Sequence, residues 1–321
     1  MDQISIVCTC DNKYCQHFAA LMSSVFENNK SEDVRVFLVT NFIDESNKKK
    51  IQALSSSYGR ELQILEIDEG RFNGLPFGGK FPHISIATFF RLLIPEVIPQ
   101  CIDKILYLDC DIIVMDNLRS LWDIDLTDVA LAGMEDCTLM TKSSPSRLGY
   151  PSIYSYFNAG VLLLNLDYLR KMDFVEKFSE YVELYCDKIL YHDQDILNAL
   201  LYDKKRLLPI KWNVMDCFLY KRPPIDRKYI SELREAKLRP SIIHYSGFPK
   251  PWHKESKHPY KDLYWRYLSL TEYKNELPEL VFPTLRLKCI HAAKITLKWI
   301  IDHLYLHSYL YDPFISSNRV F

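Results

Sequence analysis

Short apolar runs alternate with stretches of helical character over the first 115 residues, a pattern that predicts strands separated by helices. The strands are expected at 4–10, 34–40, 62–67 and 104–115, and the helices at 16–28, 44–58 and 84–98. This alternation is typical of an α/β fold with a mainly parallel central sheet. Ligands of such open sheets bind beyond the carboxyl ends of the strands, so we expect the functional site there.

The pattern becomes less regular beyond residue 116. Further strands are expected at 129–136, 157–169, 206–210 and 241–247, and further helices at 167–187 and 193–202. Because no Gly/Ser-rich linker divides the chain, we predict one large domain over 1–268 and a C-terminal helical tail over 269–321.

Composition and charge argue against several classes of protein. The net charge of −1 at pH 7 gives no general case for nucleic-acid binding. None of the nine cysteines forms a C-x₂-C pair, which argues against structural zinc and favours reduced thiols in a cytoplasmic protein. The N-terminal residues do not resemble a signal peptide. The longest uncharged stretch, 148–166, contains proline, asparagine and glycine and does not suit a membrane span.

Two carboxylates, Asp109 and Asp111, interrupt the apolar run at 104–115. An ionised carboxylate removed from water is costly unless it is paired, hydrogen-bonded or bound to a metal. Residues two apart on an extended strand point to the same side, so both could reach one divalent cation that bridges to phosphates. The spacing alone is weak evidence, because it occurs three times in the chain. The other two instances are Asp123–Asp125, expected in a solvated turn, and Asp193–Asp195.

A later segment supplies a third candidate ligand, His244, which follows a short apolar strand. An imidazole beside two carboxylates favours Mn²⁺ over Mg²⁺, which prefers oxygen ligands. The loop after His244 contains Gly247 and Lys250. Lys250 could neutralise a phosphate, and Gly247 could let backbone N–H groups approach it. For His244 taken alone, a buried and hydrogen-bonded histidine is the alternative.

Six segments, in order, resemble glycosyltransferase family 8, which comprises retaining, metal-dependent sugar transferases and includes bacterial lipopolysaccharide and lipooligosaccharide galactosyl- and glucosyltransferases. They are CDNKY (10–14), HISIATFFRL (83–92), ILYLDCDIIV (105–114), YFNAGVLLLNL (156–166), YHDQDILN (191–198) and HYSGFPKPWH (244–253). The resemblance implies a nucleotide-diphospho-sugar transferase fold of the GT-A type, with a Rossmann-like N-terminal half. The catalytic domain would then be residues 1–268.

The resemblance also implies roles for individual residues. Mn²⁺, with Mg²⁺ as the alternative, would be held by Asp109, Asp111 and His244 and would bridge the diphosphate of a UDP-hexose. The UDP-sugar would contact Asp11, Asn12, Lys13, Tyr14, Asp109, Cys110, Gly247 and Lys250. The donor sugar would be surrounded by Arg91, Asp136, Asn158, Asp193 and Gln194. One departure concerns Lys13, where close relatives carry a nucleotide-contacting asparagine.

Several of these residues also have structural interpretations. Asp193 or Asp195 could cap the helix that follows. Arg91 could extend to the surface. The run around Asn158 is also compatible with a core strand that contains a glycine bulge.

The implied reaction moves galactose or glucose from a UDP-sugar to a glycan or lipid-linked saccharide acceptor. The metal and Lys250 would stabilise the departing diphosphate. We expect front-face attack, because Gln194 is a poor nucleophile. One alternative is a haloacid-dehalogenase-like phosphotransferase, which shares the hydrophobic Asp-x-Asp segment but normally carries it near the N-terminus. The other is a non-catalytic nucleotide-sugar-binding protein.

The C-terminal tail suits an amphipathic helix over 285–310. From 281 to 321 the basic residues 286, 288, 294, 298 and 319 outnumber the acids 302 and 312. A basic, aromatic-rich helix can lie in a membrane interface, so one expectation is a cytoplasmic enzyme in peripheral contact with the membrane. The alternative is a helix packed on the catalytic domain or on a partner subunit.

Overall fold

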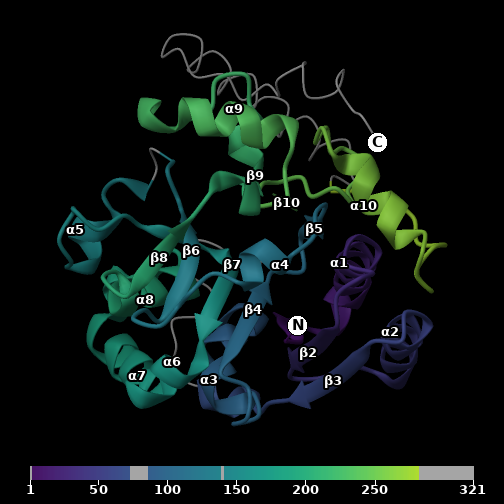
Figure 1. The fold of residues 1–321 in the computed structure, drawn as a ribbon, viewed down its shortest axis with the longest axis horizontal. Coiled ribbons are helices and arrows are strands. Elements are labelled where there is room, and N and C mark those ends of the chain that lie inside the picture. Colours follow the sequence, from purple (N-terminus) through teal and green to yellow (C-terminus); the bar gives the residue numbers. More distant parts are fainter. Residues whose placement is uncertain (1, 73–85, 139–140, 282–321) are drawn as a thin grey trace.

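The computed structural model describes residues 2–72, 86–138 and 141–281. A seven-stranded sheet at its centre has the order β3–β2–β1–β4–β7–β6–β8 (Figure 1). The strands are β1 Ile4–Thr9, β2 Val34–Thr40, β3 Glu61–Glu66, β4 Lys104–Leu108, β6 Leu131–Glu135, β7 Phe157–Asn165 and β8 Lys205–Leu208. Strands β3 to β4 run parallel, β7 is antiparallel to both of its neighbours, and β8 is parallel to β6. The prediction of an α/β fold with a mainly parallel sheet is confirmed.

A second, three-stranded sheet has the order β5–β10–β9. Its strands are β5 Ile112–Val114, β9 Val214–Met215 and β10 Ile242–His244. The central strand, β10, is antiparallel to β5 and parallel to β9. This small sheet joins segments that lie far apart in the sequence, and it brings the residue at the end of β10 beside the chain that leads into β5.

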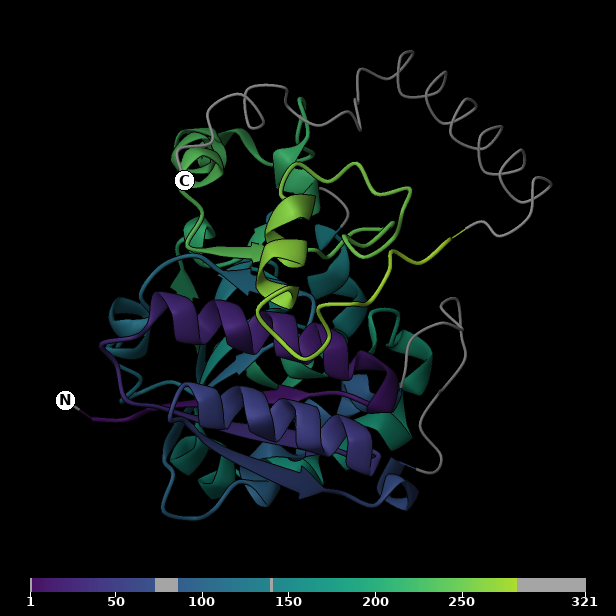
Figure 2. The same ribbon diagram turned by 90° about the vertical axis from the view of Figure 1, so that its right-hand side faces the viewer.

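Helices pack on both faces of the large sheet, because successive side chains of a buried strand point to opposite faces. Ile6 and Cys8 contribute to the core beneath α1 (Cys15–Asn28), and Val7 contributes to the core on the other face. Figure 2 shows α2 (Glu45–Ser57) beside α1, with α10 (Lys261–Leu268) on the other side of α1. The opposite face carries the 3-10 helix η3 (Ile86–Leu93), α3 (Ile94–Val97), α6 (Leu166–Lys171), α7 (Phe174–Tyr185) and α8 (His192–Leu201).

The remaining helices are short and lie in the connections. They are α4 (Arg119–Trp122), α5 (Ser144–Leu148) and α9 (Ile230–Leu238), with the 3-10 turns η1 (Asn12–Tyr14), η2 (Glu69–Phe72), η5 (Cys186–Lys188), η6 (Ile210–Trp212), η7 (Asp216–Leu219) and η8 (Arg227–Tyr229).

The prediction of one strand over 104–115 is wrong. The chain forms β4 in the large sheet and β5 in the small sheet, and it turns between them at Asp109–Asp111. The last bond to the large sheet is donated by the N–H of Asp109 to the carbonyl of Gly160 (2.9 Å). The carbonyl of Asp111 then accepts from the N–H of Tyr245, beside the small sheet (2.9 Å). The two acids therefore lie where the chain passes from one sheet to the other.

Two helix predictions also need correction. The stretch expected as one helix over 84–98 is described from residue 86, where it forms the 3-10 helix η3 and then the short α3. Pro95 has no N–H and so cannot donate the hydrogen bond that would continue a helix through this point. The helix expected over 167–187 is divided into α6 and α7, because Asp173 adopts a left-handed conformation (φ 55°). The other strands and helices predicted between residues 4 and 247 are confirmed, with differences at their ends.

Residues 271–279 lie beyond the predicted domain boundary at 268 and pack on the large domain. Tyr273 is buried, and its hydroxyl donates to Asn47 Oδ1 (2.7 Å). The N–H of Glu279 donates to the carbonyl of Trp252 (3.0 Å), and the N–H of Lys254 donates to the carbonyl of Glu279 (2.8 Å). The helix predicted over 285–310 lies outside the described residues. Within the described ranges, no helix is long and apolar enough to cross a membrane.

Candidate functional site

The three predicted metal ligands come together where the two sheets meet. Asp109 and Asp111 lie between β4 and β5, and His244 ends β10. One ligand atom from each residue lies within 4.8 Å of the others. His244 Nε2 is 3.3 Å from Asp111 Oδ1 and 3.8 Å from Asp109 Oδ2. Two carboxylates and an imidazole at this separation suit a divalent cation that accepts both oxygen and nitrogen ligands, so the residues present fit Mn²⁺.

A lysine lies directly beside this triad. Lys250 Nζ is 2.7 Å from Asp111 Oδ2, and it also donates to the carbonyl of Tyr245. Burial raises the pKa of Asp111, but Lys250 and His244 outweigh it and hold the pKa well below its usual range. Burial lowers the pKa of His244, and Asp111 with Asp109 outweighs that effect, so the pKa of His244 is raised. The site therefore holds the ionised carboxylate of Asp111 paired with the ammonium group of Lys250, a positive charge that could meet a phosphate.

Gly160 on β7 forms one wall of the triad. A Cβ atom at this position would lie 2.3 Å from Cε1 of His244 and 3.0 Å from Oδ2 of Asp109. Only a residue without a side chain allows the imidazole and the carboxylate to approach the strand so closely. We did not predict this role, although a glycine inside a buried strand is a signal of close approach.

Arg91 connects the metal triad to Asp193. Its Nη2 donates to Asp109 Oδ1 (2.8 Å), its Nε lies 2.9 Å from Asp193 Oδ2, and its Nη1 donates to the carbonyl of Ala159 (2.8 Å). The guanidinium also lies over the ring of Tyr107, whose hydroxyl donates to Asp109 Oδ1 (2.6 Å). Arg91 is 8% exposed, so the alternative in which it extends to the surface is wrong.

Asp193 is a buried carboxylate beside this arginine. Burial raises its pKa to about 6, although Arg91 lowers it in part. Its Oδ1 also accepts from the hydroxyl of Thr88 (3.3 Å). An acid with this pKa is mostly ionised at neutral pH and gains a proton under mildly acidic conditions.

Asp195 has a different environment, although it belongs to the same Asp-x-Asp triplet. Its fully buried carboxylate accepts from both Nη atoms of Arg147 (2.7 and 2.9 Å) and from the hydroxyl of Tyr156 (2.8 Å). It also accepts from the N–H groups of Leu190 and Tyr191 (both 2.7 Å). Asp195 therefore anchors the chain before α8 and has no oxygen left to react with a sugar.

The helix-cap interpretation of this triplet is wrong. Helix α8 begins at His192, so both acids lie in its first turn. The residue in the N-cap position is Tyr191, which makes no side-chain cap.

Three further predicted residues form a hydrogen-bonded group next to the triad. Gln194 Oε1 accepts from Asn158 Nδ2 (3.1 Å) and from the N–H of Ala159 (3.0 Å). Gln194 Nε2 lies 3.5 Å from Asp136 Oδ2, and burial raises the pKa of Asp136. The structure thus brings together all five residues expected around the donor sugar: Arg91, Asp136, Asn158, Asp193 and Gln194.

The expected nucleotide-contacting loop follows β1. Asp11 Oδ1 accepts from the N–H groups of Lys13 (2.9 Å) and Tyr14 (3.2 Å), which shapes the 3-10 turn η1. The side chain of Asn12 donates to Asp44 Oδ2 (2.8 Å) and accepts from Asn47 Nδ2 (2.9 Å). Asn12 therefore joins the loop to the start of α2, and its amide has these partners before any nucleotide arrives.

The side chain of Tyr14 is partly exposed and packs against two buried rings. The centroid of Tyr14 is 4.9 Å from His17 and 6.0 Å from Trp252. Lys13 is exposed. This arrangement leaves an aromatic face at the edge of the loop, where a base could stack.

Cys110 and Gly247 are constrained by neighbours outside the predicted set. The thiol of Cys110 donates to the carbonyl of Thr9 (3.5 Å), so its side chain points away from the ligands on either side. The N–H of Gly247 donates to Asp216 Oδ2, and a Cβ atom at Gly247 would lie 2.8 Å from Cγ of Asp216. The glycine thus admits a buried carboxylate under the loop that carries Lys250.

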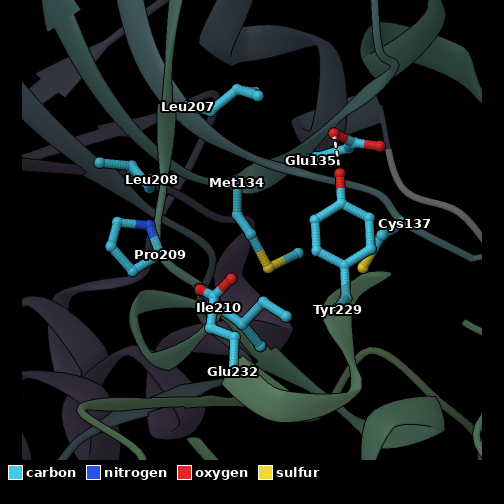
Figure 3. Close-up of a pocket in the computed structure, with 9 residues that line it drawn as sticks. All are labelled: Met134, Glu135, Cys137, Leu207, Leu208, Pro209, Ile210, Tyr229 and Glu232. Carbon is cyan, nitrogen blue, oxygen red and sulfur yellow. Dashed lines mark hydrogen bonds between the residues drawn. The ribbon is translucent and has the colours of Figure 1, made fainter. Parts of the chain in front are cut away.

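A separate pocket lies between β6, β8 and α9 (Figure 3). It is lined by Met134, Glu135, Cys137, Leu207, Leu208, Pro209, Ile210, Tyr229 and Glu232. Its two acids are engaged: Tyr229 donates to Glu135, and the N–H of Ile210 donates to Glu232. Of the described residues that line this pocket, none belongs to the metal triad.

Comparison with known proteins identifies the family. The model of glycosyl transferase family 8 matches residues 5–256. The chain belongs to glycosyltransferase family 8. The glycosyltransferase is 30% identical to general stress protein A of Bacillus subtilis (strain 168) over 281 residues, which cover 85% of this chain and 96% of that protein. It is 27% identical to a lipopolysaccharide 1,2-glucosyltransferase of Escherichia coli over 272 residues, which cover 83% of this chain and 78% of that protein.

The fold comparison agrees. The glycosyltransferase resembles the crystal structure of the galactosyltransferase LgtC in complex with donor and acceptor sugar analogues, with a TM-score of 0.75 and 30% sequence identity. The match covers 86% of this chain and 98% of that chain. These findings confirm the family resemblance, the GT-A-type fold and the assignment as an enzyme. The phosphotransferase alternative is not favoured.

Proposed function

We propose that the enzyme is a retaining hexosyltransferase that moves galactose or glucose from a UDP-sugar to a glycan or a lipid-linked saccharide. The observation that supports this most directly is the cluster of Asp109, Asp111 and His244 with Lys250 Nζ only 2.7 Å from Asp111. A nucleotide diphosphate is the leaving group that such a site would stabilise. Bound Mn²⁺, with Mg²⁺ as the alternative, would supply Lewis-acid stabilisation of the departing diphosphate.

Other residues would contact the nucleoside and the diphosphate of the donor. Asp11, Asn12, Lys13 and Tyr14 would hold the nucleoside, Asn12 through its backbone because its amide is engaged. Lys250 would turn from Asp111 to a phosphate oxygen, and the loop around Gly247 and the backbone of Cys110 would lie beside the diphosphate.

Asp193 would act on the sugar. As the bond to the diphosphate breaks, the anomeric carbon gains positive charge, and an ionised carboxylate nearby stabilises it. Gln194, held by the N–H of Ala159 and by Asn158, presents a neutral amide. Asp195 is fully engaged with five donors. The nearby candidate nucleophiles are then the neutral amide of Gln194, the engaged carboxylate of Asp195, and Asp193, whose carboxylate is paired with Arg91 and accepts from Thr88. This set favours front-face attack by the acceptor.

A panel of UDP-sugars, with and without Mn²⁺, tests the proposal. We expect UDP release from UDP-galactose or UDP-glucose with Mn²⁺, little release after chelation, and a product that keeps the anomeric configuration. Asp109→Ala should abolish release. Asp123→Ala, in the exposed triplet that ends α4, should not. If the protein binds UDP but releases it from none of the UDP-sugars, the enzyme proposal fails and the alternative of a non-catalytic nucleotide-sugar-binding protein is supported.

The contact with a membrane through 285–310 rests on the composition of that segment. Deletion of residues 282–321 should lower the fraction that sediments with anionic vesicles and should leave UDP release by the shortened chain unchanged. Equal sedimentation of the two chains would remove this part of the proposal.

A further inference from the structure

Asn213 is a buried residue behind the metal triad that the sequence analysis did not single out. It lies between η6 and β9, and its side chain is fully buried. Its Oδ1 is 2.9 Å from His244 Nδ1, on the side of the ring opposite Asp109 and Asp111. Its Nδ2 donates to Asn158 Oδ1 (2.8 Å). Asn213 therefore connects a metal ligand to the residues expected around the donor sugar.

Gln194, Asn158, Asn213 and His244 are linked by hydrogen bonds in series. Two backbone N–H groups fix which atom donates in each of these bonds. A backbone N–H can only donate, so the N–H of Ala159 identifies the acceptor oxygen of Gln194. Asn158 Nδ2 must then be the donor to that oxygen. The N–H of Gly160 likewise identifies Oδ1 of Asn158 as an acceptor (2.9 Å), so Asn213 must offer its Nδ2 to it.

The last hydrogen bond of the series joins Asn213 to His244. With Nδ2 of Asn213 turned to Asn158, its Oδ1 faces His244 and accepts from Nδ1. A neutral imidazole carries one proton, so Nε2 is left with the lone pair that faces Asp109 and Asp111. Amide and imidazole orientations are often ambiguous, but here the backbone of β7 removes the ambiguity.

We infer that Asn213 is a positioning residue that holds His244 in the Nδ1–H tautomer, so that Nε2 is free to bind the cation. The inference rests on the proposed function, because it concerns the metal of that same site. Partners behind a metal-bound histidine typically change metal affinity by about 10- to 100-fold when they are removed. Because the same amide donates to Asn158, Asn213 also supports the position of Gln194.

Two substitutions separate these contacts. Asn213→Ala removes both, and we expect Mn²⁺ affinity, measured by calorimetry without substrate, to fall about 10- to 100-fold. Asn213→Asp keeps an oxygen for His244 Nδ1 but cannot donate to Asn158. We expect this variant to bind Mn²⁺ at least as tightly as the wild type while its kcat falls several-fold.

A matched control is Asn165→Ala at the far end of β7. Asn165 also makes two side-chain hydrogen bonds, to the carbonyl of Leu126 (2.9 Å) and from the N–H of Tyr168 (3.0 Å), but it is far along the strand from the triad. We expect Asn165→Ala to lose stability without losing Mn²⁺ affinity. Equal losses of Mn²⁺ affinity in Asn165→Ala and Asn213→Ala would mean that the effect is general loosening and would overturn the inference.

The tautomer itself can be observed in the wild type, so the test does not depend on whether a variant folds. Nitrogen-15 NMR of the histidine rings, recorded at the pH at which the His244 signals report a neutral ring, should show the proton of His244 on Nδ1. A proton on Nε2 would overturn the inference. A wild-type enzyme that binds neither Mn²⁺ nor Mg²⁺ would instead overturn the proposed function. Tight Mn²⁺ binding by both the wild type and Asn213→Ala would overturn the positioning role alone.

Discussion

The backbone of Gly160 lies so close to His244 that a Cβ atom at position 160 would stand 2.3 Å from Cε1 of the imidazole. No pair of non-bonded carbon atoms tolerates that separation, so any side chain at this position must displace the histidine or bend β7. Gly160, in the core of the large sheet, thus limits the positions that the imidazole of His244, from the small sheet, can adopt.

Gly160→Ala should therefore disturb the metal site. We expect a free energy of unfolding lower by about 1–3 kcal/mol, as in other overpacked cores, and a Mn²⁺ affinity reduced by at least about tenfold. Urea unfolding and calorimetric titration measure the two effects. Gly70→Ala is the control, because the three atoms nearest to its Cβ would all belong to the side chain of Asp68. Unchanged Mn²⁺ affinity in Gly160→Ala would contradict the close packing.

Arg91 should be essential for stability as well as for activity, because two carboxylates depend on it. Arg91→Met leaves Asp109 and Asp193 without their cation, and we expect a loss of about 3–5 kcal/mol in the free energy of unfolding without metal. Arg91→Lys keeps the charge but cannot reach both carboxylates with a planar fork, so it should fall between Met and the wild type. Equal stability of the Met variant and the wild type would show that the ion pairs contribute nothing.

The raised pKa of Asp193 predicts how stability depends on pH. Its folded pKa is about 6 against an ordinary value of 3.8, so between these values the folded state binds the proton more tightly than the unfolded state. Stability then falls as pH rises through this window, by at most about 1.4 kcal/mol per pH unit from this group. In Asp193→Asn this contribution should be absent. Urea unfolding in EDTA at several pH values from 4.5 to 7 compares the slopes, and parallel slopes would refute the shift.

Lys250 should act on the diphosphate. Lys250→Met is expected to raise the KM for the UDP-sugar and to lower kcat by about 100-fold, because one positive charge at the leaving group is lost. Lys254→Met, at an exposed position in the same loop, should leave both constants near the wild-type values. Steady-state kinetics with saturating Mn²⁺ make the comparison. A kcat in Lys250→Met that stays within twofold would place the lysine outside the reaction.

Two truncations locate the end of the catalytic unit. A chain ending at residue 281 keeps the contacts of Tyr273 with Asn47 and of Glu279 with Trp252, and it should melt near the temperature of the full chain. A chain ending at 268 loses them and should melt at a lower temperature and bind UDP more weakly, because Trp252 packs near Tyr14. Equal melting of the two truncated chains would support the boundary predicted from the sequence.

The fold class and the grouping of Asp109, Asp111 and His244 could be predicted because both depend on local signals. The apolar runs of the N-terminal half are long and regular, and three of the four strands they predicted are present, while the fourth is divided between two sheets. Asp109, Asp111 and His244 stood out because ionisable side chains interrupt or end apolar runs. Such positions are costly without a partner, so the sequence itself marks them.

What the sequence left undetermined depends on contacts between distant segments. Asn213 contacts His244, and Gly160 lies close to both His244 and Asp109. The residues that flank Asn213 and Gly160 in the sequence do not indicate these contacts. The turn at Asp109–Asp111 could not be predicted from the sequence either, because the apolar residues before and after it have the pattern of one continuous strand. In the structure they belong to two sheets. The division of roles between Asp193 and Asp195 depends on Arg91 and Arg147, which lie far from them in the sequence.

That turn at Asp109–Asp111 has a mechanical consequence. The backbone of Asp109 is still bonded to the large sheet, whereas the carbonyl of Asp111 and the whole of His244 belong with the small one. A cation bound by all three side chains would link the two separately hydrogen-bonded sheets. Its binding free energy would then oppose movement of one sheet past the other, so the metal-bound enzyme would be more rigid where the two sheets meet.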